Sequence, residues 1–252
     1  MFHIHGPIGY DEKVVVVATT CEVGQPLAVL TYDSSDKMLK IFRCEDNSGM
    51  SIPTMPIRSN WGDICIFKGW PCVADKNGHT LMIEENLSVF LLANPVFGGN
   101  VKFLVESEFD LLLVDCYGID AYPYYEDDET IRFDVFKLDE KEKKWVKLTT
   151  LGDRVLFVDH ECSFSASASN LHVANGNCII FSRNCIFSGC YDLQSSMRIF
   201  HLDQDQVSRL SVYPDYLNLF WPPPKWILDL DNSGMLSCIR QDKLCNLYLW
   251  KY

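Results

Sequence analysis

The stretch that decides the fold runs IRFDVFKLDEKEKKWVKLTTLGDRVLFVDHECSFSASAS, residues 131–169. Apolar side chains recur at every second position at the start of residues 133–138, a charged turn follows at residues 139–144, and Trp145 opens a return strand. Residues 163–169 then alternate serine with phenylalanine and alanine, so nearly all of these side chains are small. Small side chains suit a strand that other backbones approach closely, as the innermost strands do around a propeller axis. The stretch therefore predicts hairpins in a crowded β-architecture.

Strand signals of the same kind recur roughly every ten residues along the chain, a spacing typical of β-sandwiches, barrels and propellers. Turn-forming clusters such as Lys76–Gly78 and Gly98–Asn100 separate them. Helical signals are weak throughout. The predicted strands are residues 14–19, 27–32, 38–43, 64–68, 72–74, 80–84, 89–93, 101–106, 111–116, 132–138, 145–148, 155–158, 164–168, 177–181, 197–202 and 207–212.

A weak internal repeat favours a propeller among these folds. Ile41–Arg43, Val135–Leu138 and Ile199–Leu202 each precede an acidic turn and a returning strand. Residues 62–83 give three short strands on tight turns, which is how a kelch-type blade is built. The sequence therefore predicts an all-β, kelch-like β-propeller, incomplete through blades missing at the N-terminus, as a single domain over residues 1–252. A β-sandwich with chance similarity among its hairpins is the alternative.

The composition is that of a folded, acidic protein. Hydrophobic residues make up 48% of the 252 residues and aromatic residues 13%, which excludes global disorder and favours strands. The net charge of −12 repels phosphate backbones, so nucleic acid is not an expected partner. The first residues lack a signal-peptide pattern, and no apolar stretch approaches the ~20 residues of a membrane span. We expect an intracellular protein, in the cytoplasm, the nucleus or both, with its cysteines reduced and no membrane partner.

Motifs for metal binding and catalysis are weak or missing. The sequence has no C-x-x-C, H-E-x-x-H or G-x-S-x-G, and Gly98-Gly99 is not followed by the Lys-Ser/Thr of a phosphate loop. His3-x-His5 is interpreted as a frayed terminus, and Cys162 beside His160 as a strand junction. Three pairs of cysteines share the same spacing of seven residues, which a hairpin could bring face to face: Cys65/Cys72, Cys178/Cys185 and Cys238/Cys245. We interpret them as buried, reduced thiols within strands rather than as metal ligands. We expect no catalytic residue, no metal and no cofactor.

Two segments lie outside the strand pattern. Residues 122–130, YPYYEDDET, form an acidic insertion, and its aromatic residues Tyr122, Tyr124 and Tyr125 are the candidate partner-binding residues. Packing of these rings on the edge of the fold is the alternative. Residues 221–226, WPPPKW, form a stiff polyproline stretch, which is interpreted as a strap packed by its two indoles rather than as a docking peptide.

Several motifs occur in an order that carries a resemblance to a known family. They are Gly62–Asp75, Phe103–Ser107 with Leu111–Val114, Leu151–Val158 after Trp145, Cys162–Ala168, Gly176–Phe181 and Trp221–Ile227. Together they resemble the plant family of F-box-associated, KIB-type (kink-suppressor) β-propeller proteins, over residues 62–227. The chain departs from the family pattern at Phe109, where the family has glycine, at Cys72, and at His160 and Glu161.

The resemblance implies a non-enzymatic protein-interaction module. Members of this family commonly carry an F-box, which docks the Skp-type adaptor of a ubiquitin ligase, ahead of a propeller that selects substrates. No F-box segment precedes the first strand here, so a protein substrate of unknown identity is expected and adaptor docking is doubtful. The alternatives are a truncated paralogue or partial gene model without a ligase role, and a propeller enzyme, against which the small residues of 163–169 argue.

Overall fold

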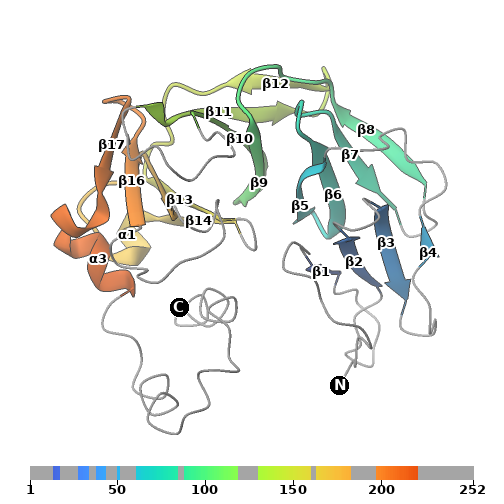
Figure 1. Cartoon of the computed structure of the whole chain (residues 1–252), viewed down its shortest axis with the longest axis horizontal. Helices are drawn as coiled ribbons and strands as arrows, with labels where there is room; N and C mark the ends of the chain where they lie inside the picture. Colours follow the sequence, from blue (N-terminus) through green and yellow to red (C-terminus); the bar gives the residue numbers. More distant parts are fainter. Residues whose placement is uncertain are drawn as a thin grey trace, which may run out of the picture. The chain divides into compact units, whose positions relative to one another are not determined.

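The computed structural model describes residues 14–17, 28–33, 38–43, 50–51, 61–84, 88–118, 130–159, 163–182 and 197–220 (Figure 1). Within these ranges the strands form four separate sheets, accompanied by short helices. The chain divides into two compact units. The first contains Met1–Ile119 and Asp134–Leu148, and the second contains Asp120–Phe133 and Thr149–Tyr252. The predicted all-β class is confirmed.

Three sheets belong mainly to the first unit, and in each the strands lie side by side in the order in which they follow in the chain. This is the meander expected of a propeller blade. The first sheet contains β1 (Val14–Val17), β2 (Ala28–Asp33), β3 (Met38–Arg43) and β4 (Met50–Ser51). The second contains β5 (Trp61–Phe67), β6 (Trp70–Asp75), β7 (Thr80–Ile83) and β8 (Val89–Ala93). The third contains β9 (Val101–Ser107), β10 (Asp110–Tyr117), β11 (Arg132–Asp139) and β12 (Lys144–Lys147).

The fourth sheet lies in the second unit and departs from the simple meander. It contains β13 (Arg154–Val158), β14 (Phe164–Ser167), β15 (Cys178–Ser182), β16 (Met197–His201) and β17 (Gln206–Arg209), in the order β14-β13-β15-β16-β17. Strand β14 pairs antiparallel with one edge of β13, and the chain then passes through α1 (Ala168–Leu171) to the other edge of β13. There β15 runs parallel to β13. Two further helical elements follow, η2 (Leu210–Val212) and α3 (Pro214–Phe220).

Most predicted strands lie within a residue or two of the observed ones, although β5 starts three residues before its predicted start and β4 was not predicted. The small-residue strand ends at Ser167 because the Ser167 hydroxyl accepts a hydrogen bond from the Asn170 N–H (3.0 Å) and caps α1. The strand expected at 207–212 stops at Arg209, where η2 begins. Helix α3 is short and starts at Pro214, a residue suited to a first helical turn. Periodicity alone gives no signal for such short helices.

A buried carboxylate joins neighbouring sheets of the first unit. Asp63 on β5 is 5% exposed, and its Oδ2 accepts a hydrogen bond from the Leu104 N–H of β9 (2.8 Å). Its Oδ1 accepts a second one from the Ile64 N–H (2.7 Å). The motif Gly62-Asp63-Ile64, which carries part of the family resemblance, therefore connects one sheet to the next.

Apolar residues from several strands pack together inside each unit. The first unit has a core cluster of Phe67, Cys72, Ala74, Ala93, Leu104, Leu111, Leu113, Leu138 and Trp145. The second has Val155, Phe157, Ala168, Val173, Cys178, Ile180, Met197, Ile199, Leu210 and Tyr216. No helix among the described residues is long and apolar enough to cross a membrane.

Candidate functional site

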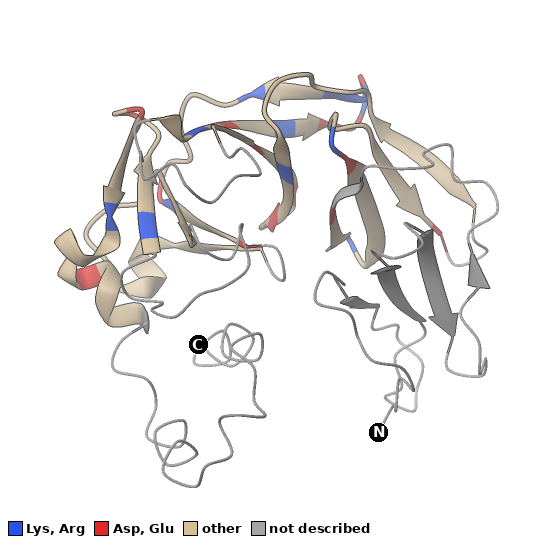
Figure 2. Cartoon of the chain, viewed as in Figure 1, with Lys and Arg blue, Asp and Glu red and all other residues tan. Residues whose placement is uncertain are grey.

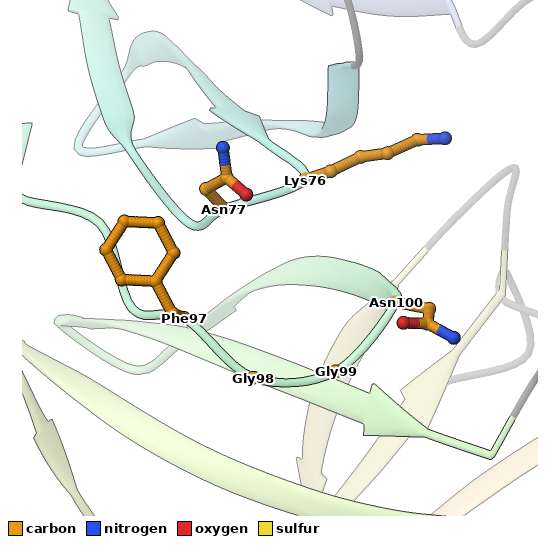
Figure 3. A pocket seen from close by; sticks show the side chains of 6 residues that line it. All are labelled: Lys76, Asn77, Phe97, Gly98, Gly99 and Asn100. Carbon is orange, nitrogen blue, oxygen red and sulfur yellow. The ribbon is translucent and has the colours of Figure 1, made fainter.

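A pocket of about 460 Å³ opens in the first unit where β6 ends and β9 begins (Figure 3). We call it the hollow, and its lining is Lys76, Asn77, Phe97, Gly98, Gly99 and Asn100. The first two residues belong to the β6–β7 turn, and the other four to the connection from β8 to β9. A hydrogen bond from the Val96 N–H to the Asn77 carbonyl oxygen (2.7 Å) joins the two segments.

The two sides of the hollow differ in character. The Phe97 side chain is 79% exposed, and in Figure 3 its ring stands on the same side of the hollow as Asn77. The Lys76 side chain extends the other way, towards the side where Asn100 lies (Figure 3). The lining thus offers an apolar ring and the Asn77 amide at one side, and a cation and the Asn100 amide at the other.

Glycine is required on the floor of the hollow. A Cβ atom at Gly98 would collide with the Tyr117 hydroxyl and the Asp115 carboxylate, and one at Gly99 would collide with the Cys116 carbonyl. Both collisions involve residues of β10, so the floor lies directly on that strand. The two glycines therefore let the β8–β9 connection pass close over β10.

A buried ion pair holds this floor from beneath. Lys102 Nζ pairs with Asp115 Oδ1, and both side chains are fully buried. Lys102 Nζ also donates to the Gly99 carbonyl oxygen (2.9 Å), and the Gly99 N–H donates to Asp115 Oδ2 (3.0 Å). The Asn100 N–H donates to the Cys116 carbonyl oxygen (2.9 Å). With these backbone groups satisfied, the connection is anchored on both strands of the β9–β10 hairpin.

The β6–β7 turn on the other side is fixed in a similar way. The Asp75 Oδ1 atom accepts from the N–H groups of Asn77 (2.8 Å) and His79 (2.9 Å). Gly78 has a positive φ of 75°, and its carbonyl oxygen accepts from the indole N–H of the core residue Trp145 (2.9 Å). As the sequence predicts, Lys76–Gly78 and Gly98–Asn100 lie between strands, and both are rigidly held.

The chemistry of the hollow is that of a binding surface. Its side chains include neither a carboxylate, a histidine nor a thiol. Burial raises the pKa of the Cys72 and Cys116 thiols far above its ordinary value, and it raises the pKa of Cys178 to about 12. These thiols are therefore poor nucleophiles at neutral pH. Burial, followed by the neighbouring Asp115 carboxylate, raises the pKa of Tyr117 to about 12. Among the residues that the structure describes, no group of three metal-ligating side chains forms.

The predicted partner-binding residues Tyr122, Tyr124 and Tyr125 lie outside the described residues, as do residues 221–226. Their role therefore stays a prediction. The pairs His3/His5 and His160/Cys162 also fall outside. Cys65 and Cys72 are thiols that lie opposite each other across the β5–β6 hairpin, which confirms the geometry expected from their spacing.

Phe97 is the residue of the hollow that sequence reasoning missed. The sequence indicates only a turn at Gly98–Asn100 and no phosphate-binding loop there. The available signal was an aromatic residue placed directly before two glycines in a connection, where no alternation of apolar residues predicts its burial.

Comparisons with known proteins agree with the architecture. A family model described as the KIB1-4 β-propeller matches residues 3–213. The F-box protein SKIP23 of Arabidopsis thaliana is 34% identical over 239 residues, which cover 86% of this chain and 58% of that protein. A second Arabidopsis thaliana F-box protein is 31% identical over 216 residues, covering 80% of this chain and 52% of the relative. A putative F-box/kelch-repeat protein from the same plant is 27% identical over 195 residues, which cover 75% of this chain and 52% of that protein. The chain thus spans about half the length of the curated relatives it matches.

Proposed function

Because the chain belongs to the plant F-box-associated KIB1-4 β-propeller family, we propose that it is an intracellular, non-enzymatic module that selects protein substrates for a ubiquitin ligase. Ubiquitin transfer would be carried out by other subunits. Docking of a Skp-type adaptor is a task of an F-box and not of a propeller. The function proposed for the described residues is therefore restricted to the choice of substrate.

One observation carries this proposal: an aromatic side chain that is 79% exposed stands on a connection anchored from beneath. Burying a phenylalanine side chain against a partner contributes about 1.5–3 kcal/mol. Little conformational freedom is lost on binding when the loop is already held in place. Aromatic side chains, phenylalanine included, are enriched at protein–protein interfaces relative to the rest of the surface.

Affinity capture from plant cells with matched variants tests the proposal. Phe97→Ser removes the exposed ring from the hollow, while Phe109→Ser removes a ring that is 85% exposed at the other end of β9. We expect a protein that the wild type and Phe109→Ser retain, that Phe97→Ser loses, and that becomes longer-lived when the chain is removed from the cell. An unchanged lifetime of the captured protein would contradict substrate selection, whereas equal capture by both variants would exclude Phe97 from the binding surface.

A further inference from the structure

We propose that the hollow receives an extended segment of a partner protein in which a carboxylate side chain lies next to an apolar side chain. This class of substrate rests on the function proposed above. The carboxylate would face Lys76 and the apolar side chain would pack on Phe97, which lie on different sides of the hollow (Figure 3).

The charge of the lining selects the carboxylate. Lys76 is exposed and has no carboxylate partner among the described residues, and the lining itself contains no acidic group. Asp75, which precedes Lys76 in the chain, and Asp115, which contacts the floor, have partners of their own. Asp75 accepts from backbone N–H groups of its own turn, and Asp115 pairs with Lys102 and Gly99. Lys76 therefore supplies the single charge of the lining, although the Asp75 carboxylate lies next to it in the chain.

The net charge of −12 does not cancel this local preference. At physiological ionic strength, charges separated by more than about 8–10 Å are largely screened from one another. Acidic and basic residues are dispersed over the described part of the chain, as Figure 2 shows, although single strands such as β10 (acidic) and β12 (basic) carry one sign only. A carboxylate in contact with Lys76 is governed by that contact more than by the distant charges.

Phe97 and the glycine floor set the rest of the specificity. The exposed ring offers an apolar surface to a neighbouring side chain of the segment. Gly98 and Gly99 form a floor of backbone atoms, because a Cβ atom at either position would point into β10 and not into the hollow. Asn77 is exposed on the Phe97 side and offers its side-chain amide to the backbone of an extended segment.

A phosphate group fits the hollow less well than a carboxylate does. Phosphate sites use several backbone N–H groups or a cluster of arginines. Here the N–H groups of Gly99 and Asn100 are already donated to Asp115 and to the Cys116 carbonyl oxygen, and the lining contains no arginine. A single lysine with amides on either side matches one carboxylate.

Selection from a random-peptide display library on the purified chain tests the proposal. We expect wild-type protein to enrich peptides in which aspartate or glutamate lies within two positions of an apolar residue. Lys76→Glu should lose the acidic preference, and Phe97→Ser should lose the apolar one. The matched controls are Lys68→Glu, at the other end of β6, and Phe109→Ser, at the other end of β9, and both should select the same peptides as the wild type.

The strongest selected peptide then serves as the probe in a fluorescence-polarisation titration. We expect Lys76→Glu and Phe97→Ser each to weaken its binding by about tenfold or more, with both controls within about twofold of the wild type. Enrichment without an acidic preference, or equal binding by Lys76→Glu, overturns the proposal.

The two proposals fail in different ways. If a partner captured in cells binds Lys76→Glu and Phe97→Ser as tightly as it binds the wild type, the hollow is not its docking site, although substrate selection can still stand. If wild-type protein enriches acidic–apolar peptides but captures no partner whose lifetime it controls, the chemistry of the hollow stands and the ligase role falls.

Discussion

At the scale of single residues, we expect loss of the buried Lys102–Asp115 ion pair to lower the stability of the first unit strongly. Replacing Lys102 by methionine keeps the length of the side chain but leaves a buried carboxylate without its cation. We expect Lys102→Met to lower the free energy of unfolding by about 3–5 kcal/mol. Chemical denaturation followed by circular dichroism measures this loss.

The third sheet also supplies a matched control for this prediction. Lys137 pairs with Asp110 at 2.7 Å, but both side chains are 46% exposed. Because solvent screens such a pair, Lys137→Met should cost less than about 1 kcal/mol. Equal losses for the two variants would mean that burial does not set the value of the Lys102–Asp115 pair.

His201 should give the second unit a dependence on pH. It is 9% exposed, its Nε2 has no hydrogen-bond partner, and its ring lies 5.2 Å from that of Tyr213. Burial lowers the pKa of His201 below its ordinary value of 6.5, against the opposing effect of Asp203. The unfolded chain therefore takes up this proton more readily than the folded one, and stability falls as the pH drops below 6.5.

Thermal melting at about pH 7.5 and about pH 5.5 measures this effect of histidine protonation. We expect a lower melting temperature at the acidic pH, and a smaller difference for His201→Gln, which cannot titrate. If that variant shows the same pH dependence as the wild type, other groups are responsible.

The sequence contains more information on such contacts than periodicity reveals. A turn centred on Glu108 and Phe109 places Lys102 directly opposite Asp115, and the observed register shows this pairing. The predicted hairpin therefore implied the ion pair, although a lysine within a strand looks like a solvated charge. The exposure of Phe97 could not be deduced in the same way, because it depends on how two connections pack together.

At the scale of elements, hairpins were predictable because a tight turn fixes the register of both strands. The parallel pairing of β13 with β15 was not predictable, since it depends on β14 taking the outer side of β13. The small side chains of β14 were expected for an innermost strand. Among the described residues β14 is an edge strand of its sheet, a position that the innermost strand of a blade also has. Local alternation defines a strand but does not define its neighbours.

Asp63 makes a prediction about how neighbouring sheets are held together. Asp63→Ala removes the acceptor for the Leu104 and Ile64 N–H groups, which lie in β9 and β5. We expect the free energy of unfolding to fall by about 2–4 kcal/mol, because two buried donors lose their partner. Hydrogen exchange should show faster exchange at Leu104 in the variant. An unchanged Leu104 amide would mean that the carboxylate does not join the two sheets.

At the scale of the whole molecule, the charge balance of 22 basic against 34 acidic residues should affect how fast a partner segment arrives. An acidic segment approaching a protein with a net charge of −12 is repelled at long range and attracted by Lys76 only at contact. Added salt screens the long-range repulsion more effectively than the short-range contact.

The association rate constant of a selected acidic–apolar peptide should therefore rise by a few-fold between about 20 mM and about 200 mM salt, where the screening length shortens several-fold. Lys76→Glu should act mainly on the dissociation rate, because the lost interaction is a contact. Biolayer interferometry at the two salt concentrations separates these rates. An association rate that falls steeply with salt would mean that a cationic surface steers the peptide, contrary to the dispersed charges and acidic balance of this chain.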